Sequence, residues 1–478
     1  FRPYYHYNFP IYYSYLMMPV YFLAGGAGVK LFNFLVVIVV AAITFGLGRA
    51  VGLRRPLIPV LGVLLTPGIV QAATNVGNDL AVLTFGLGGI LLLHGYRHGR
   101  HRSFLILAFA SLGFAIGIKY QSVLFLPWYL WLLWAALERR LNASGFRLLV
   151  LLGLITLLLP APFFLRNYLN TGVPDWPMHL DLFGAQRDFA YEMAMRYSTG
   201  LIGERSFETA ISGLLAFVTT GLTLPTMWLF SFLGIYALLR SRQDQTGLYL
   251  VFGIISQLTL WWIVQPSLYP RFVIYLIPQL MVAALLGFEI LTAPWIRRSA
   301  LVVAAASAGL GLVVLAAYSQ GPILYTLDGD LERYHDFTWF HDEYTWMDQN
   351  LPKDATVLVV TLSGHTYYMP RPYLRADPTH SGLIDWREID SQGLHDEMGR
   401  LDLGYVFYQD RDWSDAVGGA ELNSVMEDFA ERKDVRRLWT RNVVLGTSRI
   451  RGATMNTKAW LLERILPPPS PESNSPSG

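Results

Sequence analysis

"VKLFNFLVVIVVAAITFGL", residues 29–47, is followed after a short turn by "LIPVLGVLLTPGIVQAA", residues 57–73. Both runs are almost free of charge, and the turn between them holds Arg49, Arg54 and Arg55. A bilayer core of ~30 Å needs ~20 mostly apolar residues in one helix. The pattern therefore predicts two helices that cross a membrane and meet at a charged turn.

The same pattern repeats along the chain, which is 53% hydrophobic and only 15% charged. Apolar residues gather in long blocks, as they do in polytopic membrane proteins. Ten segments qualify as membrane helices, at residues 29–47, 57–73, 80–95, 104–118, 122–137, 148–165, 222–239, 248–264, 272–292 and 300–317. The predicted fold is an all-α polytopic membrane domain at residues 29–319, with a long external loop at 166–207, followed by a small soluble α/β domain.

Arginines occupy alternate connections between these segments, and such residues are retained on the cytoplasmic side of a membrane. The arginine-containing connections hold Arg49, Arg54 and Arg55; Arg97, Arg100 and Arg102; Arg139, Arg140 and Arg147; Arg240 and Arg242; and Arg297 and Arg298. The remaining connections, the first 28 residues and everything after Ser319 are therefore expected on the opposite side, which we call the trans face.

The overall charge excludes one class of partner. Net charge is +2, and the positive residues lie in short turns, so the basic stripe that nucleic acid needs is absent from the sequence. The chain has no cysteine, which rules out disulfides and thiolate metal sites. No cofactor is indicated. A divalent cation stays open, because His, Asp and Glu residues do not cluster at ligand spacing.

The two ends of the chain differ from the apolar blocks. Residues 1–28 are rich in aromatics, and Tyr12, Leu16, Val20 and Leu23 recur near helical spacing, which predicts an interfacial helix on the trans surface. Residues 325–466 combine short β-type runs, "DATVLVV", "YLRAD", "GYVFYQD" and "NVVLGTSRIR", with helical stretches, "HDEYTWMDQNLP" and "EIDSQGLHDEMGRL", which predicts the α/β domain. Residues 467–478 form a Pro/Ser tail that is expected to be disordered.

Lys119, in "GIKYQSVLFLP", carries a positive charge on the face where such residues are disfavoured. One interpretation is a lysine that snorkels to the headgroups. The other is a cation held for an anionic ligand, and a lipid-linked phosphate is the anion found at that depth. Tyr120 follows it directly.

Other polar residues fall on the same predicted face. Asn78 and Asp79 stand at one trans turn, where Asp79 either caps the next helix or orients groups in a site. Arg166 and Asn167 stand at a helix exit, and Tyr269 and Arg271 where the ninth helix begins; each arginine is either an interface anchor or part of a site. His6 lies in the aromatic N-terminal stretch, either packed or positioning a ligand.

In this arrangement the residues resemble the C-type glycosyltransferases, polytopic enzymes that use polyprenyl-phosphate sugars, and above all the branch with protein O-mannosyltransferases and lipid A aminoarabinose transferases. "TPGIVQAATNVGNDLAVLTFGLG" is similar to a family segment with Asp79 at its acidic position, and "LGFAIGIKYQSVLFLP" to a Gly-rich helix that ends in Lys119 and Tyr120. "RNYLNTGVPDWP" resembles a family loop but has Val173 for Asn, and "YPRFVIYLIP" resembles another motif but has Phe272 for Tyr.

The resemblance implies transfer of a sugar from a polyprenyl-phosphate donor to a lipid, glycan or protein acceptor, at the extracytoplasmic face of a bacterial or archaeal cytoplasmic membrane and in contact with membrane lipids. Lys119, Arg271 and Arg166 would bind the donor phosphate, and Asp79, Asn78, Tyr120, Asn167, Tyr269 and His6 would line the site. The family's acidic base follows its first membrane helix, so both are expected upstream of Phe1, in a fragment truncated at its N-terminus.

Two other classes fit a polytopic chain. A lipid or polysaccharide transporter would place ionisable residues near the bilayer midplane. A non-catalytic scaffold with an external sensor domain would not need cations in several trans turns. The sequence distinguishes neither the sugar nor the acceptor.

Overall fold

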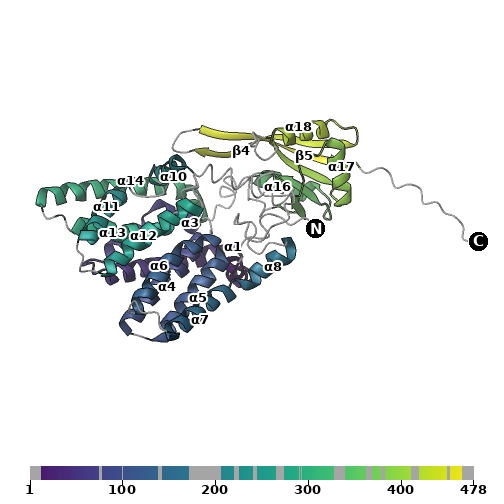
Figure 1. Cartoon of the computed structure of the whole chain (residues 1–478). Coiled ribbons are helices and arrows are strands. Elements are labelled where there is room, and N and C mark those ends of the chain that lie inside the picture. The colour runs from purple at the N-terminus through teal and green to yellow at the C-terminus, as the bar shows by residue number, and fades with distance from the viewer. Residues whose placement is uncertain are drawn as a thin grey trace, which may run out of the picture. The chain divides into compact units, whose positions relative to one another are not determined.

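The computed structural model describes residues 12–74, 78–99, 101–137, 143–171, 206–219, 225–240, 245–264, 274–289, 291, 293–327, 340–361, 369–377, 383–410, 419–448 and 453–465. The chain divides into two compact units. One is helical and lies within residues 9–175 and 201–316, and the other contains the α/β sheet within residues 317–478 (Figure 1). Each unit is described separately.

The helical elements overlap the predicted apolar segments, although the first begins at Tyr12, within the predicted interfacial helix, and the last continues to Leu327. They are α1 (Tyr12–Ala50), α2 (Leu57–Leu64), α3 (Pro67–Thr74), α4 (Asp79–Gly99), α5 (Arg102–Ile118), the 3-10 helix η2 (Tyr120–Phe125), α6 (Leu126–Ala136), α7 (Ala143–Leu158), α8 (Ala161–Thr171), α10 (Phe207–Thr219), α11 (Pro225–Arg240), α12 (Gln245–Val264), α13 (Ile277–Glu289) and α14 (Pro294–Leu327). Helix α10 was not predicted, because it begins at the end of what the sequence indicated was one long loop.

Three segments predicted as single helices are broken. Segment 57–73 forms α2 and α3, which are separated just before Pro67; segment 122–137 forms η2 and α6, with Pro127 in the first turn of α6. Segment 148–165 forms α7 and α8, which meet at a bend of 53° near Pro160. Proline has no N–H to donate and its ring clashes with the preceding turn, so these breaks follow from the sequence.

Helix length limits which elements can cross a bilayer alone. In the described part of the chain, Gly28–Ala50 and Asp79–Gly99 are long and apolar enough, and Ala143–Leu158 with Ala161–Leu169 counts as a third if the bent pair is one span. Four shorter apolar helices have 10–17 residues: Arg102–Ile118, Met227–Arg240, Gly247–Ile263 and Ile274–Glu289. The helical unit therefore has membrane-type helices.

Small residues let the helices approach closely. Helix α5 packs against both α4 and α7 (Figure 1), and a Cβ added at Gly113 would lie 2.6 Å from the Thr156 carbonyl oxygen. Helices α11 and α13 pack closer still, because a Cβ at Gly234 would lie 1.8 Å from the Ala283 carbonyl oxygen. Glycine at these crossings is a packing requirement of membrane helix bundles.

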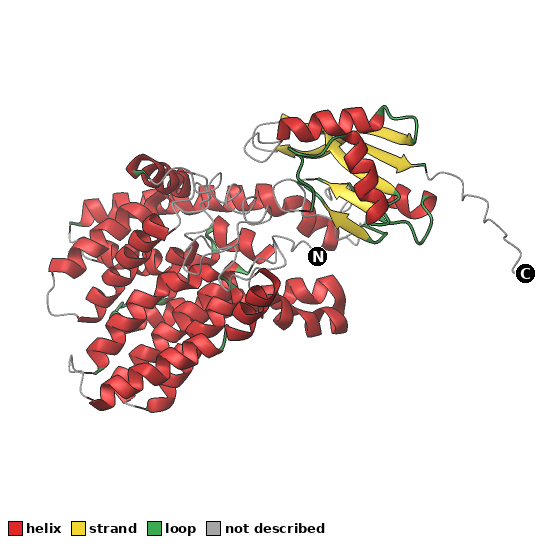
Figure 2. Ribbon diagram, turned by 45° about the vertical axis from the view of Figure 1, so that its right-hand side comes forward, coloured by secondary structure: helices red, strands yellow, loops and turns green. Residues whose placement is uncertain are grey.

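The α/β unit is a three-layer structure around a mixed sheet (Figure 2). The strands are β1 (Val357–Val360), β2 (Tyr373–Arg375), β3 (Tyr405–Asp410), β4 (Val435–Ser448) and β5 (Ala453–Arg464), in the order β2-β1-β3-β5-β4. Strands β1, β2 and β3 are parallel, and β5 is antiparallel to both β3 and β4. The helices are α16 (His341–Asn350), α17 (Ser391–Arg400) and α18 (Gly419–Ala430).

Alternate strand residues enter two separate cores. Leu358 and Val406 pack with α17 and α18, whereas Val359 and Phe407 pack with α16. Burial on both faces explains the continuous apolar run of β1. The sequence predicted β1, β2, β3, α16, α17 and part of β4, but it did not predict β5, which lies inside the sheet between β3 and β4.

Candidate functional site

Asp79 and Lys119 form an ion pair inside the helical unit. Asp79 is the first residue of α4, and Lys119 follows the last residue of α5 in an extended conformation. The Lys119 Nζ donates to Asp79 Oδ1, and the two side chains are only 14% and 10% exposed. The aspartate also occupies the first turn of a helix, where the macrodipole favours negative charge. The structure thus holds a charged pair out of bulk water.

A tyrosine completes this group. The Tyr275 hydroxyl donates to the same Asp79 Oδ1 at 3.0 Å and lies 3.4 Å from Gln121 Oε1. Tyr275 is 1% exposed and stands in the single 3-10 turn just before α13. A carboxylate that accepts from both a lysine and a tyrosine is oriented more firmly than one in a simple pair. We refer to Asp79, Lys119 and Tyr275 as the triad.

A second set of contacts joins the residue after Lys119 to α8. The Asn167 side-chain amide donates to the Tyr120 hydroxyl at 3.0 Å, and Arg166 donates to Asn167 Oδ1 at 3.3 Å. The Arg166 guanidinium also lies 4.7 Å from the centre of the Phe163 ring, a distance at which a cation is attracted to an aromatic face. Tyr120 and Asn167 are buried. Arg166 is therefore brought to the same end of α5 as Lys119.

Asn78 belongs to the same region. Its side-chain amide donates to the Ile118 carbonyl oxygen at 3.4 Å, and its own carbonyl accepts from Val82 N, so Asn78 connects the start of α4 to the end of α5. These contacts bring six of the nine sequence-predicted residues into one region: Asp79, Lys119, Asn78, Tyr120, Asn167 and Arg166. His6, Tyr269 and Arg271 lie outside the described residues.

The sequence did not predict Tyr275 or Gln121. Tyr275 was expected inside the apolar ninth helix, and it is 196 residues from the carboxylate that it contacts. A tyrosine hydroxyl within an apolar run could have indicated a site residue. The sequence does not show whether Tyr269 or Tyr275 reaches Asp79, because that depends on where α13 begins. Gln121 is two residues beyond Lys119, in the short 3-10 helix that replaced the predicted helix start.

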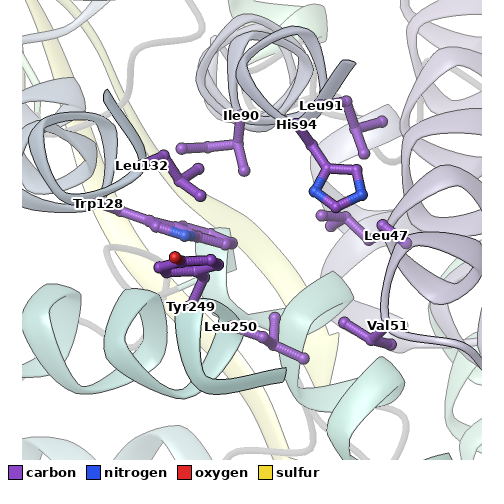
Figure 3. Close-up of a pocket in the computed structure, with 10 residues that line it drawn as sticks. Leu47, Val51, Ile90, Leu91, His94, Trp128, Leu132, Tyr249 and Leu250 are labelled. Carbon is purple, nitrogen blue, oxygen red and sulfur yellow. The ribbon is translucent and has the colours of Figure 1, made fainter. Parts of the chain in front are cut away.

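The pocket of Figure 3 lies at the opposite end of α4 from the triad. Asp79 begins that helix, whereas the pocket-lining His94 is about 22 Å further along it. Figure 3 shows the His94 ring among Leu47, Val51, Leu91 and other mostly apolar side chains, with Trp128 and Tyr249 across the space. The cavity volume is about 20 Å³, enough for one or two waters. This pocket is too small for a sugar.

The described residues do not form a metal site. Within the described ranges, no three His, Asp or Glu side chains gather where they could hold an ion. The triad contributes a single carboxylate, to which the Lys119 ammonium and the Tyr275 hydroxyl both donate.

No protein-family profile and no curated protein sequence matches the chain. Solved structures do. ArnT from Cupriavidus metallidurans bound to undecaprenyl phosphate is 13% identical with a TM-score of 0.58, over 95% of this chain and 88% of that one. Archaeal oligosaccharyltransferase AglB from Archaeoglobus fulgidus, in complex with an inhibitory peptide and a dolichol-phosphate, is 13% identical with a TM-score of 0.51. The Archaeoglobus fulgidus oligosaccharyltransferase in complex with Zn and sulfate is 15% identical with a TM-score of 0.54.

The chain shares the fold of these membrane glycosyltransferases. It covers 61% and 59% of the two archaeal chains, against 88% of ArnT, so the likeness to ArnT spans the most complete architecture of the three. The predicted resemblance to the C-type glycosyltransferases is confirmed at the level of the fold.

Proposed function

We propose that the protein is an integral-membrane glycosyltransferase that moves a sugar from a polyprenyl-phosphate donor to an acceptor on the extracytoplasmic face of a cytoplasmic membrane. The observation that carries the proposal is the buried Asp79–Lys119 pair with Tyr275, in a chain that has this fold. ArnT was solved with undecaprenyl phosphate and AglB with a dolichol-phosphate, which supports a lipid-phosphate donor for this chain as well.

The reaction needs positive charge at the leaving group. An acceptor oxygen or nitrogen attacks the anomeric carbon, the bond from that carbon to the phosphate oxygen breaks, and its electron pair stays on the phosphate. A fixed lysine ammonium where water is scarce stabilises that charge. Lys119 has three N–H donors, and Asp79 keeps the ammonium in place. Arg166, and Arg271 by its position in the sequence, are the other donor-phosphate ligands in this proposal.

The other predicted residues have supporting roles. Asn78, Tyr120 and Asn167 would line the site beside the triad, joined by Tyr269 and His6. A divalent cation is left open.

The proposal includes the finer architecture. Ten spans result when α2 with α3, η2 with α6, and α7 with α8 are each counted as one broken helix and α10 is not counted as a span. Residues 1–28 and the α/β unit at 325–466 would share the extracytoplasmic side, around the membrane domain at 29–319 and its loop at 166–207. The acceptor is a lipid, a glycan or a protein. The arginine alternation supports this orientation.

No specific observation favours the transporter alternative. Away from the triad, the described helices bury a polar pair, Gln257 with Gln279, whose amides bond to each other at 3.2 and 3.4 Å. Both are uncharged and nearly fully buried, so they join α12 to α13 and line no path for a substrate.

Lipid binding tests the proposal directly. We expect the detergent-solubilised protein to retain undecaprenyl phosphate in native mass spectrometry in preference to undecaprenol, which lacks the phosphate. Lys119→Met should reduce that retention by about tenfold, since a charge-assisted hydrogen bond is worth about 1.5 kcal/mol or more. Lys433→Met removes an exposed lysine of the α/β unit and serves as the matched control. Equal retention of the two lipids by the unaltered protein would contradict the proposal.

A further inference from the structure

The α/β unit has a hollow at the edge where its parallel strands begin. Residues before β1, residues before β3, the start of β4 and the end of β5 meet there, because β5 runs opposite to its neighbours. The cavity volume is about 530 Å³. Ligand pockets of small molecules typically measure about 300–1,000 Å³. The hollow is therefore of a size to hold a ligand of one or two sugar rings.

Fixed polar groups line this hollow. The Tyr405 hydroxyl donates to Glu463 Oε1 at 3.3 Å, and Arg436 Nε donates to Glu463 Oε2 at 2.7 Å. Tyr405 on β3 and Arg436 on β4 lie on the two strands beside β5, and together they hold the Glu463 carboxylate in one orientation. Burial and the Glu463 charge raise the pKa of Tyr405, so its hydroxyl stays protonated over the whole physiological range. The lining therefore offers donors and acceptors together.

Two further carboxylates in the lining lack partners. Among the described residues, neither Asp354 nor Asp402 has a cation or a hydrogen bond on its side chain. Asp402 is held in the left-handed region, at φ 54°, and its carbonyl accepts from Thr356 at 2.7 Å, so the backbone that carries it is fixed. Both acceptors face solvent and are free to bind hydroxyl groups.

The charges restrict the class of ligand. The hollow has three carboxylates, Asp354, Asp402 and Glu463, against two guanidinium groups, Arg436 and Arg464. A phosphate or a uronic acid would meet more negative than positive charge. Ligands with many hydroxyl groups suit such a lining, because each hydroxyl both donates and accepts.

We propose that this hollow is a binding site for an uncharged saccharide. The carboxylates of Asp354, Asp402 and Glu463 would accept from neighbouring hydroxyls of the ligand, and the Arg436 guanidinium and the Tyr405 hydroxyl would contact others. The ligand class is argued from the lining alone, and the site does not depend on the proposed transferase activity of the helical unit.

The test uses the full-length protein in detergent and titrates four neutral probes, the methyl glycosides of glucose, galactose, mannose and arabinose, with sodium glucuronate as the anionic comparison. Binding is followed by saturation-transfer NMR. At least one methyl glycoside should bind with a Kd tighter than ~10 mM, and glucuronate more weakly. Tyr405→Phe should weaken that glycoside about threefold, and Glu463→Gln about tenfold, the range for neutral and charged hydrogen bonds.

The chain offers a closely matched control. Glu397 pairs with Arg400 elsewhere in the α/β unit. The side chains of Arg400 and Glu397 are 63% and 22% exposed, the same fractions as those of Arg436 and Glu463. Glu397→Gln should bind the glycoside like the unaltered protein. Lys119→Met should also bind it normally, which separates this site from the proposed donor site. The inference is overturned if none of the four glycosides binds, or if Tyr405→Phe and Glu463→Gln, once shown to be folded by thermal unfolding, bind as the control does.

Discussion

The Lys119 ammonium donates a hydrogen bond to the buried Asp79 carboxylate, and the rate of the proposed transfer should depend on the lysine's positive charge. Lys119→Met keeps the aliphatic stem and removes the ammonium, so turnover should fall by ~100- to 1,000-fold, or about 2.7–4 kcal/mol. A lysine that only snorkels would give little change. The measurement is lipid-donor turnover of the full-length protein. Near-normal turnover would show that Lys119 is an anchor and not a ligand of the phosphate.

Removing Lys119 also leaves Asp79 buried without its cation, which by itself can destabilise the bundle by several kcal/mol. The double variant Lys119→Met with Asp79→Asn separates the two effects, because it removes both charges together. It should unfold closer to the unaltered protein than Lys119→Met does, while its turnover stays low. Recovery of turnover in the double variant would point to misfolding as the cause of the loss.

Tyr275 acts on the phosphate only through Asp79, so its contribution should be smaller. Tyr275→Phe removes the hydrogen bond that the neutral hydroxyl donates to the Asp79 carboxylate, and it keeps the ring. We expect turnover to fall about fivefold, near 1 kcal/mol. Tyr249→Phe, which alters a tyrosine of the pocket at the far end of α4, is the control and should leave turnover unchanged. A fall as large as that of Lys119→Met would instead place Tyr275 against the substrate.

Glu343 makes the stability of the α/β unit depend on pH. Desolvation by burial is the main cause that raises the pKa of this carboxyl above its ordinary 4.5, and Arg441, 4.0 Å away, opposes the shift only weakly. The folded state therefore binds the proton more tightly, so stability falls as pH rises from 4.5 through the folded pKa. Glu343→Gln should raise the unfolding temperature at pH 7.5, and the gain should disappear below pH 4.5. A gain that is independent of pH would contradict this origin.

Helices α11 and α13 cross where glycines lie against backbone atoms of the facing helix. A Cβ at Gly287 would lie 2.1 Å from the Phe230 carbonyl oxygen, and backbone atoms cannot move aside as a side chain can. Gly287→Ala should cost about 1–3 kcal/mol and lower the unfolding temperature in detergent. Gly153→Ala, in α7 where nothing lies within 4 Å of the added Cβ, is the matched control and should be neutral or slightly stabilising. Equal unfolding temperatures would mean that the two helices lie further apart.

Elements differ in how far the sequence determines them. Long apolar blocks predicted α4, α5 and the part of α1 from Val29 to Leu47 well, because composition alone makes such helices. The breaks beside Pro67 and Pro160 needed proline to be given more weight than hydropathy. Strand β5 was missed because its run from Ala459 to Leu462 is continuously apolar, as in a strand buried on both faces, and such a run cannot be told from a helix by periodicity.

The candidate site could be predicted only in part, namely where it depends on which membrane face each turn is predicted to occupy. Asp79 and Lys119 were each placed at a trans turn by the arginine pattern, so their meeting followed from topology. The contact of Tyr275 with Asp79 did not, because it depends on the rotation of the 3-10 turn before α13. Which of several polar residues in a turn reaches a buried partner is fixed by packing between helices, and no local pattern encodes it.

For the whole molecule, the arginine alternation predicts that residues 1–28 and the α/β unit share the trans side. The chain has no cysteine, so a cysteine introduced at Asn8, at Asp410 or at Ser241 is its sole thiol. A membrane-impermeant maleimide applied to intact spheroplasts should label the first two positions. Ser241→Cys stands between Arg240 and Arg242 in a turn predicted to be cytoplasmic, and it should react only after the membrane is opened. Labelling of positions 8 and 410 from opposite sides would contradict the topology, and with it the placement of Lys119 and Arg166 on the face where the donor phosphate is expected.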